Sequence, residues 1–218
     1  MEKQKIPASP SVRRLPLYLY TIRQAQLNGS RYISGTLIAQ ELRLEPIQVR
    51  KDLALTGIIG KPKKGYPVED LIKAIECFLG WDSVQDVVLV GAGNLGSALM
   101  GHQEFRLHGL HIVAAFDKNP QKVGTTIHGV RVLAIDSMEA EIRKMGVKIA
   151  ILTIHADVAQ ETADRLVAAG ISGIWNFTAI KIQVPESVAV QGENLSAGYA
   201  MLCVAMQARL NGDDRNAG

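Results

Sequence analysis

A glycine-rich turn at residues 91–96 constrains more than any other feature what this chain can fold into. It follows an apolar run ending at Val90 and precedes a helix-forming segment, so a G-x-G-x-x-G pattern stands between a predicted strand and a predicted helix. Gly91 permits a tight turn, Gly93 leaves room for a pyrophosphate on the helix N-terminus, and Gly96 lets the helix pack closely on the sheet. The predicted contacts of this turn with a dinucleotide are Gly91, Ala92, Gly93, Asn94, Leu95 and Gly96.

The next predicted strand, residues 111–116, ends at an acidic residue. This residue, Asp117, lies 26 positions beyond Gly91. A carboxylate there accepts hydrogen bonds from the ribose hydroxyls of adenosine and repels the 2′-phosphate of NADP(H). The predicted cofactor is therefore NAD(H). The alternative interpretation is a glycine turn in an α/β core that binds no ligand.

Beyond this point β-branched segments alternate with helical ones, which predicts a mostly parallel, doubly wound α/β sheet of the Rossmann type. Further strands are expected at residues 130–133, 149–154, 171–177 and 188–190, and helices at residues 137–145 and 158–169. Ligands of such sheets bind beyond the carboxyl ends of the strands. Thr153, Ile154 and His155 stand at one of those ends, and they are predicted to line the cofactor site.

The charge of the chain is divided unevenly along its length. Residues 1–66 hold 12 lysines and arginines against 4 acidic residues, a local charge of +8, while the rest of the chain carries −5. The formal net charge of +3 therefore conceals two parts of opposite sign. Such asymmetry indicates an N-terminal module that binds a polyanion.

Within the basic part, residues 34–55 predict two short helices joined by a tight turn. Ser34 or Thr36 can cap the first helix, and Pro46 can open the second. Four apolar residues of the second helix are expected to face a core: Ile47, Val49, Leu53 and Leu55. Three polar residues are expected on its other side: Gln48, Arg50 and Lys51. A helix pair whose second member is basic on its outer face is typical of a helix-turn-helix.

Residues 57–66 follow this helix as a glycine-bounded segment with three lysines. A β-hairpin wing laid along DNA phosphates suits that composition, so the unit is predicted to be a winged helix. Arg50 or Gln48 would then reach base edges in the major groove. The alternative for such a basic cluster is a solvated face with no partner. The residues predicted to contact DNA are Ser34, Gln48, Arg50, Lys51, Lys61, Lys63 and Lys64.

A length of 218 residues with 47% hydrophobic content suffices for two compact domains. The predicted domains are residues 1–80 and 84–192, and residues 1–13 are expected to form a mobile arm. No apolar run approaches the roughly 18 residues that span a bilayer, and no secretory signal is present, so the sequence predicts a cytoplasmic protein without membrane contact. Cys77 and Cys203 lie far apart without a C-x-x-C pattern, which indicates two free thiols.

Dinucleotide-binding sheets also occur in dehydrogenases, so an NAD-dependent oxidoreductase is the alternative function. His155 is then the candidate proton donor or acceptor. The sequence leaves no room for a substrate domain beside the winged helix, and we predict no catalytic residue. His108 and His111 have a spacing that suits a metal, but no cysteine or acidic ligand stands nearby, so no metal site is predicted.

Several segments together resemble the Rex family of bacterial redox-sensing transcriptional repressors. The resemblance runs from Arg14 to about Met206, and a winged helix joined to this kind of dinucleotide domain is specific to few families. The segments that carry it are Leu15-Pro16-Leu17-Tyr18-Leu19, residues 48–53, Gly60-Lys61 with Gly65-Tyr66, residues 90–99, Phe116-Asp117, Lys122-Val123-Gly124, residues 167–171 and Asn176-Phe177.

This resemblance implies a homodimer on inverted-repeat operator DNA that NADH releases, with NAD⁺ favouring the DNA-bound form. It also implies that the C-terminal segment, residues 193–212, is a helix exchanged between subunits. Family members couple their domains through an Arg, a Tyr and an Asp, and the corresponding positions here hold Tyr20, His102 and Asn194. A DNA-binding relative in which NAD(H) is structural, or in which the response to it is altered, is therefore a further alternative.

Overall fold

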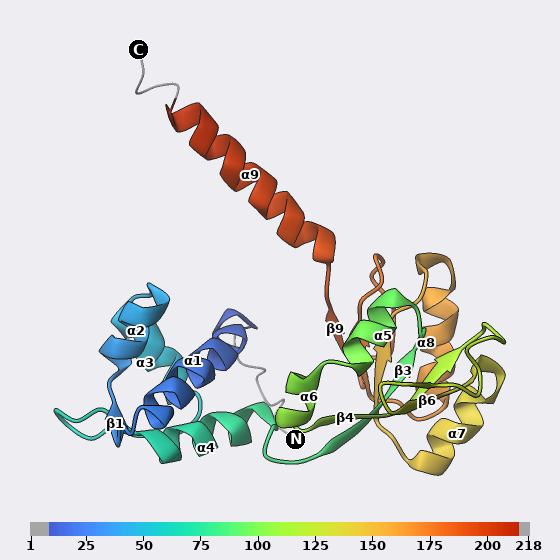
Figure 1. The fold of residues 1–218 in the computed structure, drawn as a ribbon, viewed down its shortest axis with the longest axis horizontal. Helices are drawn as coiled ribbons and strands as arrows, with labels where there is room; N and C mark the ends of the chain where they lie inside the picture. The colour runs from blue at the N-terminus through green and yellow to red at the C-terminus, as the bar shows by residue number, and fades with distance from the viewer. Residues whose placement is uncertain (1–8, 214–218) are drawn as a thin grey trace. The chain divides into compact units, whose positions relative to one another are not determined.

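The structure is a computed structural model that describes residues 9–213 (Figure 1). It divides into two compact units between Val84 and Gln85. The elements of the N-terminal unit are helices α1 (Ser9–Leu27), α2 (Gly35–Leu42), α3 (Pro46–Ala54) and α4 (Val68–Leu79), and the short strands β1 (Tyr32–Ile33) and β2 (Tyr66–Pro67).

The four helices of the N-terminal unit enclose one hydrophobic core. Each helix contributes fully buried side chains, among them Leu15, Ile38, Leu53 and Leu71. Ser34 caps α2, because its Oγ accepts a hydrogen bond of 3.0 Å from the backbone N–H of Leu37. The predicted helix pair, with Pro46 at the start of α3, is confirmed.

The wing is a tight hairpin whose antiparallel bridge joins Lys61 and Gly65. At its base β1 pairs with β2 in antiparallel fashion, with Ile33 opposite Tyr66. Gly65 has a φ of +87°, and a Cβ at this position would lie 2.3 Å from the carbonyl oxygen of Ile33. A glycine is therefore required where the wing returns to the helical core.

Two expectations for this unit are wrong. The expected mobile arm is helical from Ser9, because Arg14 of α1 binds Asp52 and Leu15 is buried in the core. Residues 1–8 lie outside the described part. Ile47 and Leu55 do not face the core, since their side chains are 61% and 39% exposed. In α3 the core takes Val49 and Leu53, which lie four residues apart on one face.

The C-terminal unit contains a seven-stranded sheet in the order β5-β6-β4-β3-β7-β8-β9. All neighbouring strands are parallel except β5 and β6. The strands are β3 (Gln85–Val90), β4 (Leu110–Asp117), β5 (Thr126–Ile127), β6 (Val130–Ala134), β7 (Ile149–Leu152), β8 (Gly173–Asn176) and β9 (Ala189–Gly192). The helices are α5 (Asn94–Met100), α6 (Gln103–Leu107), η1 (Ile135–Ser137), α7 (Met138–Met145), η2 (Ala156–Val158), α8 (Ala159–Ala168) and α9 (Leu195–Asp213).

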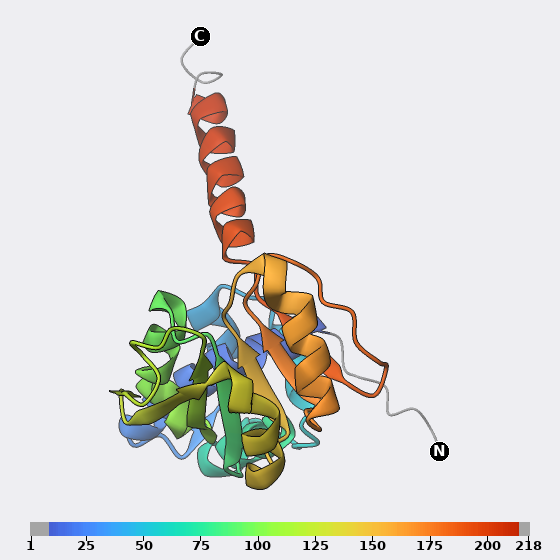
Figure 2. The same ribbon diagram turned by 90° about the vertical axis from the view of Figure 1, so that its right-hand side faces the viewer.

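Helices cover both faces of this sheet, as Figure 2 shows for α8 in orange and the green helices opposite it. Along β3, Val88 and Val90 pack in a cluster with side chains of α7 and α8. Val87 and Leu89 of the same strand pack in a second cluster with side chains of α5. Successive residues of β3 thus point to opposite faces. The predicted doubly wound parallel sheet is confirmed.

Two short elements, α6 and β5, were not expected, because five and two residues carry too little periodicity to be recognised. The C-terminal segment forms the helix α9, as expected. Its large apolar side chains are exposed within the chain, among them Tyr199, Met201 and Val204. No helix within residues 9–213 combines the length and the apolar character needed to cross a bilayer.

Candidate functional site

The glycine turn after β3 is closely packed against the neighbouring strand β7. Gly91 has a φ of +100°, and a Cβ there would lie 2.6 Å from the carbonyl oxygen of Thr153. A Cβ at Gly96 would lie 2.1 Å from the carbonyl oxygen of Gly91. Both positions therefore require glycine for steric reasons, and the predicted close approach of helix and sheet at Gly96 is confirmed.

Gly93 has a different role, since a Cβ at this position would meet no atom within 4 Å. It is the N-cap of α5 and supplies no side chain that could accept from the amides of the first turn. These amides and the open space beside Gly93 together suit an anionic group such as a phosphate. Sterics within the chain do not demand glycine here, and the open space beside it can hold a ligand.

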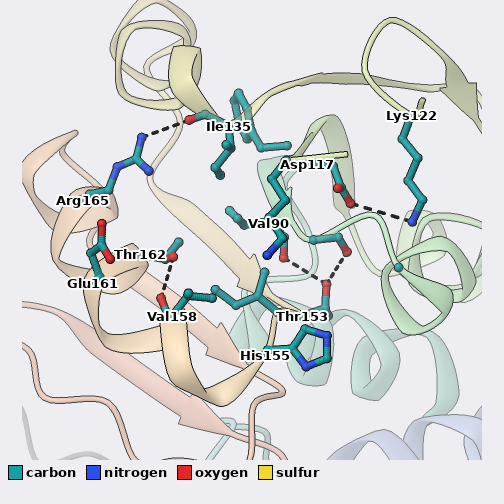
Figure 3. A pocket seen from close by; sticks show the side chains of 15 residues that line it. Val90, Asp117, Lys122, Ile135, Thr153, His155, Val158, Glu161, Thr162 and Arg165 are labelled. Atoms are coloured by element: carbon teal, nitrogen blue, oxygen red, sulfur yellow. Dashed lines mark hydrogen bonds and ion pairs between the residues drawn. The ribbon is translucent and has the colours of Figure 1, made fainter. Parts of the chain in front are cut away.

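A cavity of about 370 Å³ lies at the carboxyl ends of β3, β4 and β7 (Figure 3). Six residues predicted to bind or line the cofactor site line it: Gly91, Gly93, Asp117, Thr153, Ile154 and His155. The other four do not line the cavity. Ala92 is buried, and Asn94, Leu95 and Gly96 belong to the first turn of α5.

Asp117 ends β4 at the wall of this cavity and is largely buried. Its Oδ1 accepts a hydrogen bond of 2.8 Å from the backbone N–H of Asn119, and its Oδ2 lies 4.0 Å from Nζ of Lys122. Lys122 also donates to the carbonyl oxygen of Ala92 at 2.8 Å. The lysine thus links the acidic residue to the glycine turn, a role that the spacing of the sequence did not indicate.

Thr153 and His155 occupy the loop after β7. The hydroxyl of Thr153 lies 2.8 and 3.1 Å from the carbonyl oxygens of Gly91 and Val90 and donates to them. This contact holds the glycine turn against the end of β7. The exposed side chain of His155 lines the cavity and forms no ion pair with any residue of the described range 9–213. Without a carboxylate to orient its ring, His155 lacks the usual setting of a catalytic histidine.

The wall of the cavity at α8 holds residues that the sequence analysis did not identify. Arg165 donates to the carbonyl oxygen of Ile135 at 3.0 Å (Figure 3). It also donates to Oε2 of Glu139 at 2.9 Å. The hydrogen bond from Arg165 lowers the pKa of the Glu139 carboxyl. No motif marked Arg165, because its partners lie in a different helical segment and only the fold brings them together.

In the N-terminal unit, helix α3 presents a continuous exposed face. The residues of this face follow the helical spacing i, i+3, i+4 and i+7, and they are Ile47, Arg50, Lys51 and Ala54. Nε of Arg50 donates to the carbonyl oxygen of Pro46 at 3.3 Å, which turns this side chain toward the first turn of the helix. Two cations therefore stand between two apolar side chains on the outer surface of α3.

Gln48 is not on this exposed face. Its side-chain amide donates a hydrogen bond of 2.8 Å to Oδ1 of Asp52, whose carboxylate is 1% exposed. Asp52 also accepts from Arg14 at 2.7 Å and from the hydroxyl of Tyr18 at 2.7 Å. Burial would raise the pKa of the Asp52 carboxyl, but hydrogen bonds from Arg14, Tyr18, Ser11 and Gln48 lower it to about 2. This network joins α3 to α1.

Wing and helix together border a basic hollow of about 510 Å³. Five residues predicted to contact DNA line it: Ser34, Arg50, Lys61, Lys63 and Lys64. Tyr32 holds two of the lysines, because Nζ of Lys61 and Nζ of Lys64 lie 5.6 and 5.7 Å from its ring centre. Lys51 and Gln48 lie outside the hollow.

The histidines and cysteines form no cluster suited to a metal within residues 9–213. Nδ1 of His111 lies 3.0 Å from Oδ1 of Asp86 in an exposed pair on neighbouring strands. Cys77 and Cys203 are free thiols.

The fold and the two sites define a class: proteins in which a basic winged helix is joined to a dinucleotide-type α/β domain. Two family models match, "Putative DNA-binding protein N-terminus" over residues 5–54 and "CoA binding domain" over residues 82–180. The redox-sensing transcriptional repressor Rex of Treponema denticola is 56% identical over 209 residues, which cover 96% of this chain and 100% of that protein. The chain belongs to the Rex family of redox-sensing transcriptional repressors, and the resemblance seen in the sequence is confirmed.

Solved structures agree over the whole length. The crystal structure of RSP in complex with beta-NAD+ and operator DNA matches with a TM-score of 0.89 and 32% identity, covering 99% of each chain. The crystal structure of RSP in complex with beta-NADH matches with a TM-score of 0.86 and 32% identity, covering 97% of this chain and 99% of that chain.

Proposed function

We propose that this chain is a DNA-binding transcriptional repressor that senses redox state through the NADH/NAD ratio, with NADH releasing operator DNA. The observation that carries the proposal is the match over 99% of the chain to RSP, a Rex-family repressor solved both with beta-NAD+ and operator DNA and with beta-NADH. Action on chromosomal operators implies a cytoplasmic location.

The cofactor site proposed for NAD(H) is the cavity at the carboxyl end of the sheet. The open space at Gly93 and the amides of the first turn of α5 suit the pyrophosphate, and Asp117 suits the adenosine ribose. Thr153 and His155 would line the site, while Ala92, Gly96 and Lys122 hold the turn in shape. Asn94 and Leu95 contribute through the backbone of α5.

The proposed DNA contacts divide between bases and phosphates. Arg50 and Lys51 stand on the exposed face of α3, where a recognition helix meets base edges. Ser34 and the wing residues Lys61, Lys63 and Lys64 would contact phosphates around the basic hollow. Gln48, whose amide is held by Asp52, would contribute mainly by fixing the orientation of α3.

The functional unit is proposed to be a homodimer on an inverted repeat. Helix α9 carries exposed apolar side chains on every side, a pattern that water does not favour and that a second subunit would cover. The proposed domains are residues 1–80, which bind DNA, residues 84–192, which bind NAD(H), and residues 193–212, which exchange between subunits.

A ligand shifts an equilibrium between two dimer shapes only by its difference in affinity for them. The side chains that stand in for the family's coupling residues bring no charged pair. Tyr20 is exposed, His102 stacks on Phe105 with ring centres 4.6 Å apart, and Asn194 caps α9 at Ala197. We propose that NADH still acts, through contacts other than a charge-assisted pair among these three residues. We assign the protein no catalytic activity.

Fluorescence anisotropy of a labelled inverted-repeat DNA from the gene's own upstream region tests the proposal. Protein is titrated at fixed NAD⁺ or at fixed NADH. We expect tight binding with NAD⁺ and release with NADH. Binding that is equal under both cofactors would leave NAD(H) a structural role. No specific binding, together with NADH turnover on small carbonyl compounds, would instead favour an oxidoreductase.

A further inference from the structure

An apolar side chain stands on the outer face of α3, where the helical spacing had predicted a core residue. Ile47 is 61% exposed and does not belong to the hydrophobic core of its unit, whereas Val49 and Leu53 of the same helix are fully buried in that core. The fold of the unit therefore does not account for a branched aliphatic side chain at this position. Burial of Ile47 would have to come from a partner.

The surroundings of Ile47 point to the nature of this partner. Ile47 lies in the first turn of α3, with Arg50 and Lys51 three and four residues further along the same exposed face. The hydrogen bond from Arg50 to the carbonyl oxygen of Pro46 turns the arginine toward this first turn. An aliphatic surface beside two cations fits a ligand that is polyanionic and carries an apolar group.

Double-stranded DNA has that combination in its major groove. The first turn of a recognition helix meets base edges there, and the C5-methyl group of thymine is the apolar group that the groove displays. Ile47 has no hydrogen-bonding group, so it can distinguish bases only through such an apolar contact.

We propose that Ile47 is a specificity-determining residue that packs against a thymine methyl group, next to the base that Arg50 contacts. This inference rests on the proposed function, because it requires α3 to be the recognition helix. Each half-site then contains a thymine whose methyl group contributes to affinity. Loss of one buried methyl-sized group corresponds to about fourfold weaker binding per half-site and about 15-fold for a symmetric pair.

Replacement of thymine by deoxyuridine removes this methyl group and leaves base pairing and the phosphate charge unchanged. The experiment is an anisotropy titration of the full-length protein with its operator, in which symmetric thymine pairs are replaced one pair at a time. For the wild-type protein we expect one pair at which deoxyuridine weakens binding by about 15-fold. For Ile47→Ala, the thymine and deoxyuridine operators should bind equally at that pair.

Lys63→Ala is the matched control, because it changes a proposed phosphate contact in the wing and leaves the exposed face of α3 intact. It should weaken binding to both operators and keep the difference between them. If wild-type protein binds every deoxyuridine operator as well as the thymine operator, or if Ile47→Ala keeps the difference, the role of Ile47 is wrong while the repressor function stands. If wild-type protein binds no operator DNA, the proposed function itself fails.

Discussion

Asp52 shows how a single charged residue can fix the position of helix α3, the proposed recognition helix. It stands beside two cations in the sequence Arg50-Lys51-Asp52, which reads as a solvated polar stretch. In the structure its carboxylate is buried and receives hydrogen bonds from Arg14, Tyr18 and Gln48. Two of these three partners, Arg14 and Tyr18, lie on α1, so this one side chain helps to fix the register of α3 against α1.

Asp52→Asn should destabilise the N-terminal unit by about 3 kcal/mol, because the part-buried Arg14 would lose its buried charged partner. Trp81 packs against the core of this unit and Trp175 belongs to β8. Urea unfolding followed by Trp81 fluorescence in a Trp175→Phe background therefore measures the effect. Glu45→Gln is the control, since Glu45 is exposed and makes no side-chain cap bond to α3. Equal stability of the two variants would contradict the role given to Asp52.

The Asp52 carboxyl should also make the stability of the N-terminal unit depend on pH in the acid range. The pKa of the Asp52 carboxyl falls from an ordinary 3.8 to about 2 in the folded protein. Its contribution to the free energy of unfolding is therefore complete above pH 3.8 and is lost as the pH falls through about 2. The expected contribution is about 2 kcal/mol. The difference in unfolding free energy between wild type and Asp52→Asn should therefore shrink between about pH 4 and pH 2. A difference that stays constant over this range would refute the assignment.

At the scale of elements, the sequence predicted the helix pair and the parallel strands correctly but misplaced parts of their faces. The spacing of Ile47, Val49, Leu53 and Leu55 allowed a broad apolar stripe, but only the two inner residues are buried. A helix of nine residues makes about two turns against the core, and the sequence alone does not tell which apolar residues lie at the edge of the contact. The structure was needed to show that Ile47 faces outward.

The wing was predicted from its composition, but its attachment was not. Strand β1 has two residues, too few for any periodicity, and it pairs with β2 from a distant part of the chain. Tyr32 of β1 thereby comes under the lysines of the wing. This arrangement holds Lys61 and Lys64 together despite their like charge, and it concentrates positive charge at the basic hollow.

Lys63→Ala combined with Lys64→Ala should weaken binding to all DNA sequences and flatten its salt dependence. Each lost phosphate contact lowers the slope of log K against log salt by about 0.9, so the expected change is about 1.8 per subunit. Titrations of specific and random DNA at several salt concentrations measure both slopes. Lys144→Ala removes an exposed lysine of α7 and serves as the control. An unchanged slope in the double variant would exclude the wing from the interface.

The glycine turn allows a matched comparison within one element. Gly93→Ala should fold normally, because the new Cβ meets no atom, yet it should weaken NADH binding by filling the space beside α5. Gly96→Ala should lower the melting temperature, because its Cβ would lie 2.1 Å from a backbone oxygen. Calorimetry gives the melting temperatures and NADH fluorescence the affinities. Normal NADH affinity in Gly93→Ala would mean that the phosphates bind elsewhere.

At the scale of the whole molecule, the uneven charge distribution predicted that the chain has two parts with different partners. Within the described residues, the basic part up to Tyr66 forms α1, α2, α3 and the wing, and the acidic part forms α4, the large sheet and α9. The glycine pattern and Asp117 located the cavity, because the order of strand, turn and helix is local in sequence. The contact of Lys122 with Ala92 and those of Arg165 with Ile135 and Glu139 were not predicted, because these partners are 26 to 30 residues away in the sequence.

Helix α9 is the part of the chain whose structure is explained least by the chain itself. Large apolar residues occur around its circumference, including Leu195, Tyr199, Met201 and Val204, and all are exposed. A helix that is apolar on all sides is stable in water only when other elements surround it. The wild-type protein should therefore sediment at twice the 23.6 kDa of one chain.

Tyr199→Asp combined with Leu202→Asp places two charges on α9 and should convert this dimer into a monomer, since burial of an unpaired carboxylate is costly. The monomer should lose affinity for an inverted repeat, because each recognition helix would then bind its half-site alone. Gln207→Glu adds a charge at an exposed polar position of the same helix and should leave the mass unchanged. Sedimentation velocity gives the mass, and anisotropy gives the DNA affinity. A dimer that persists in the double variant would place the subunit interface outside α9, and the apolar surface of this helix would then require a different partner.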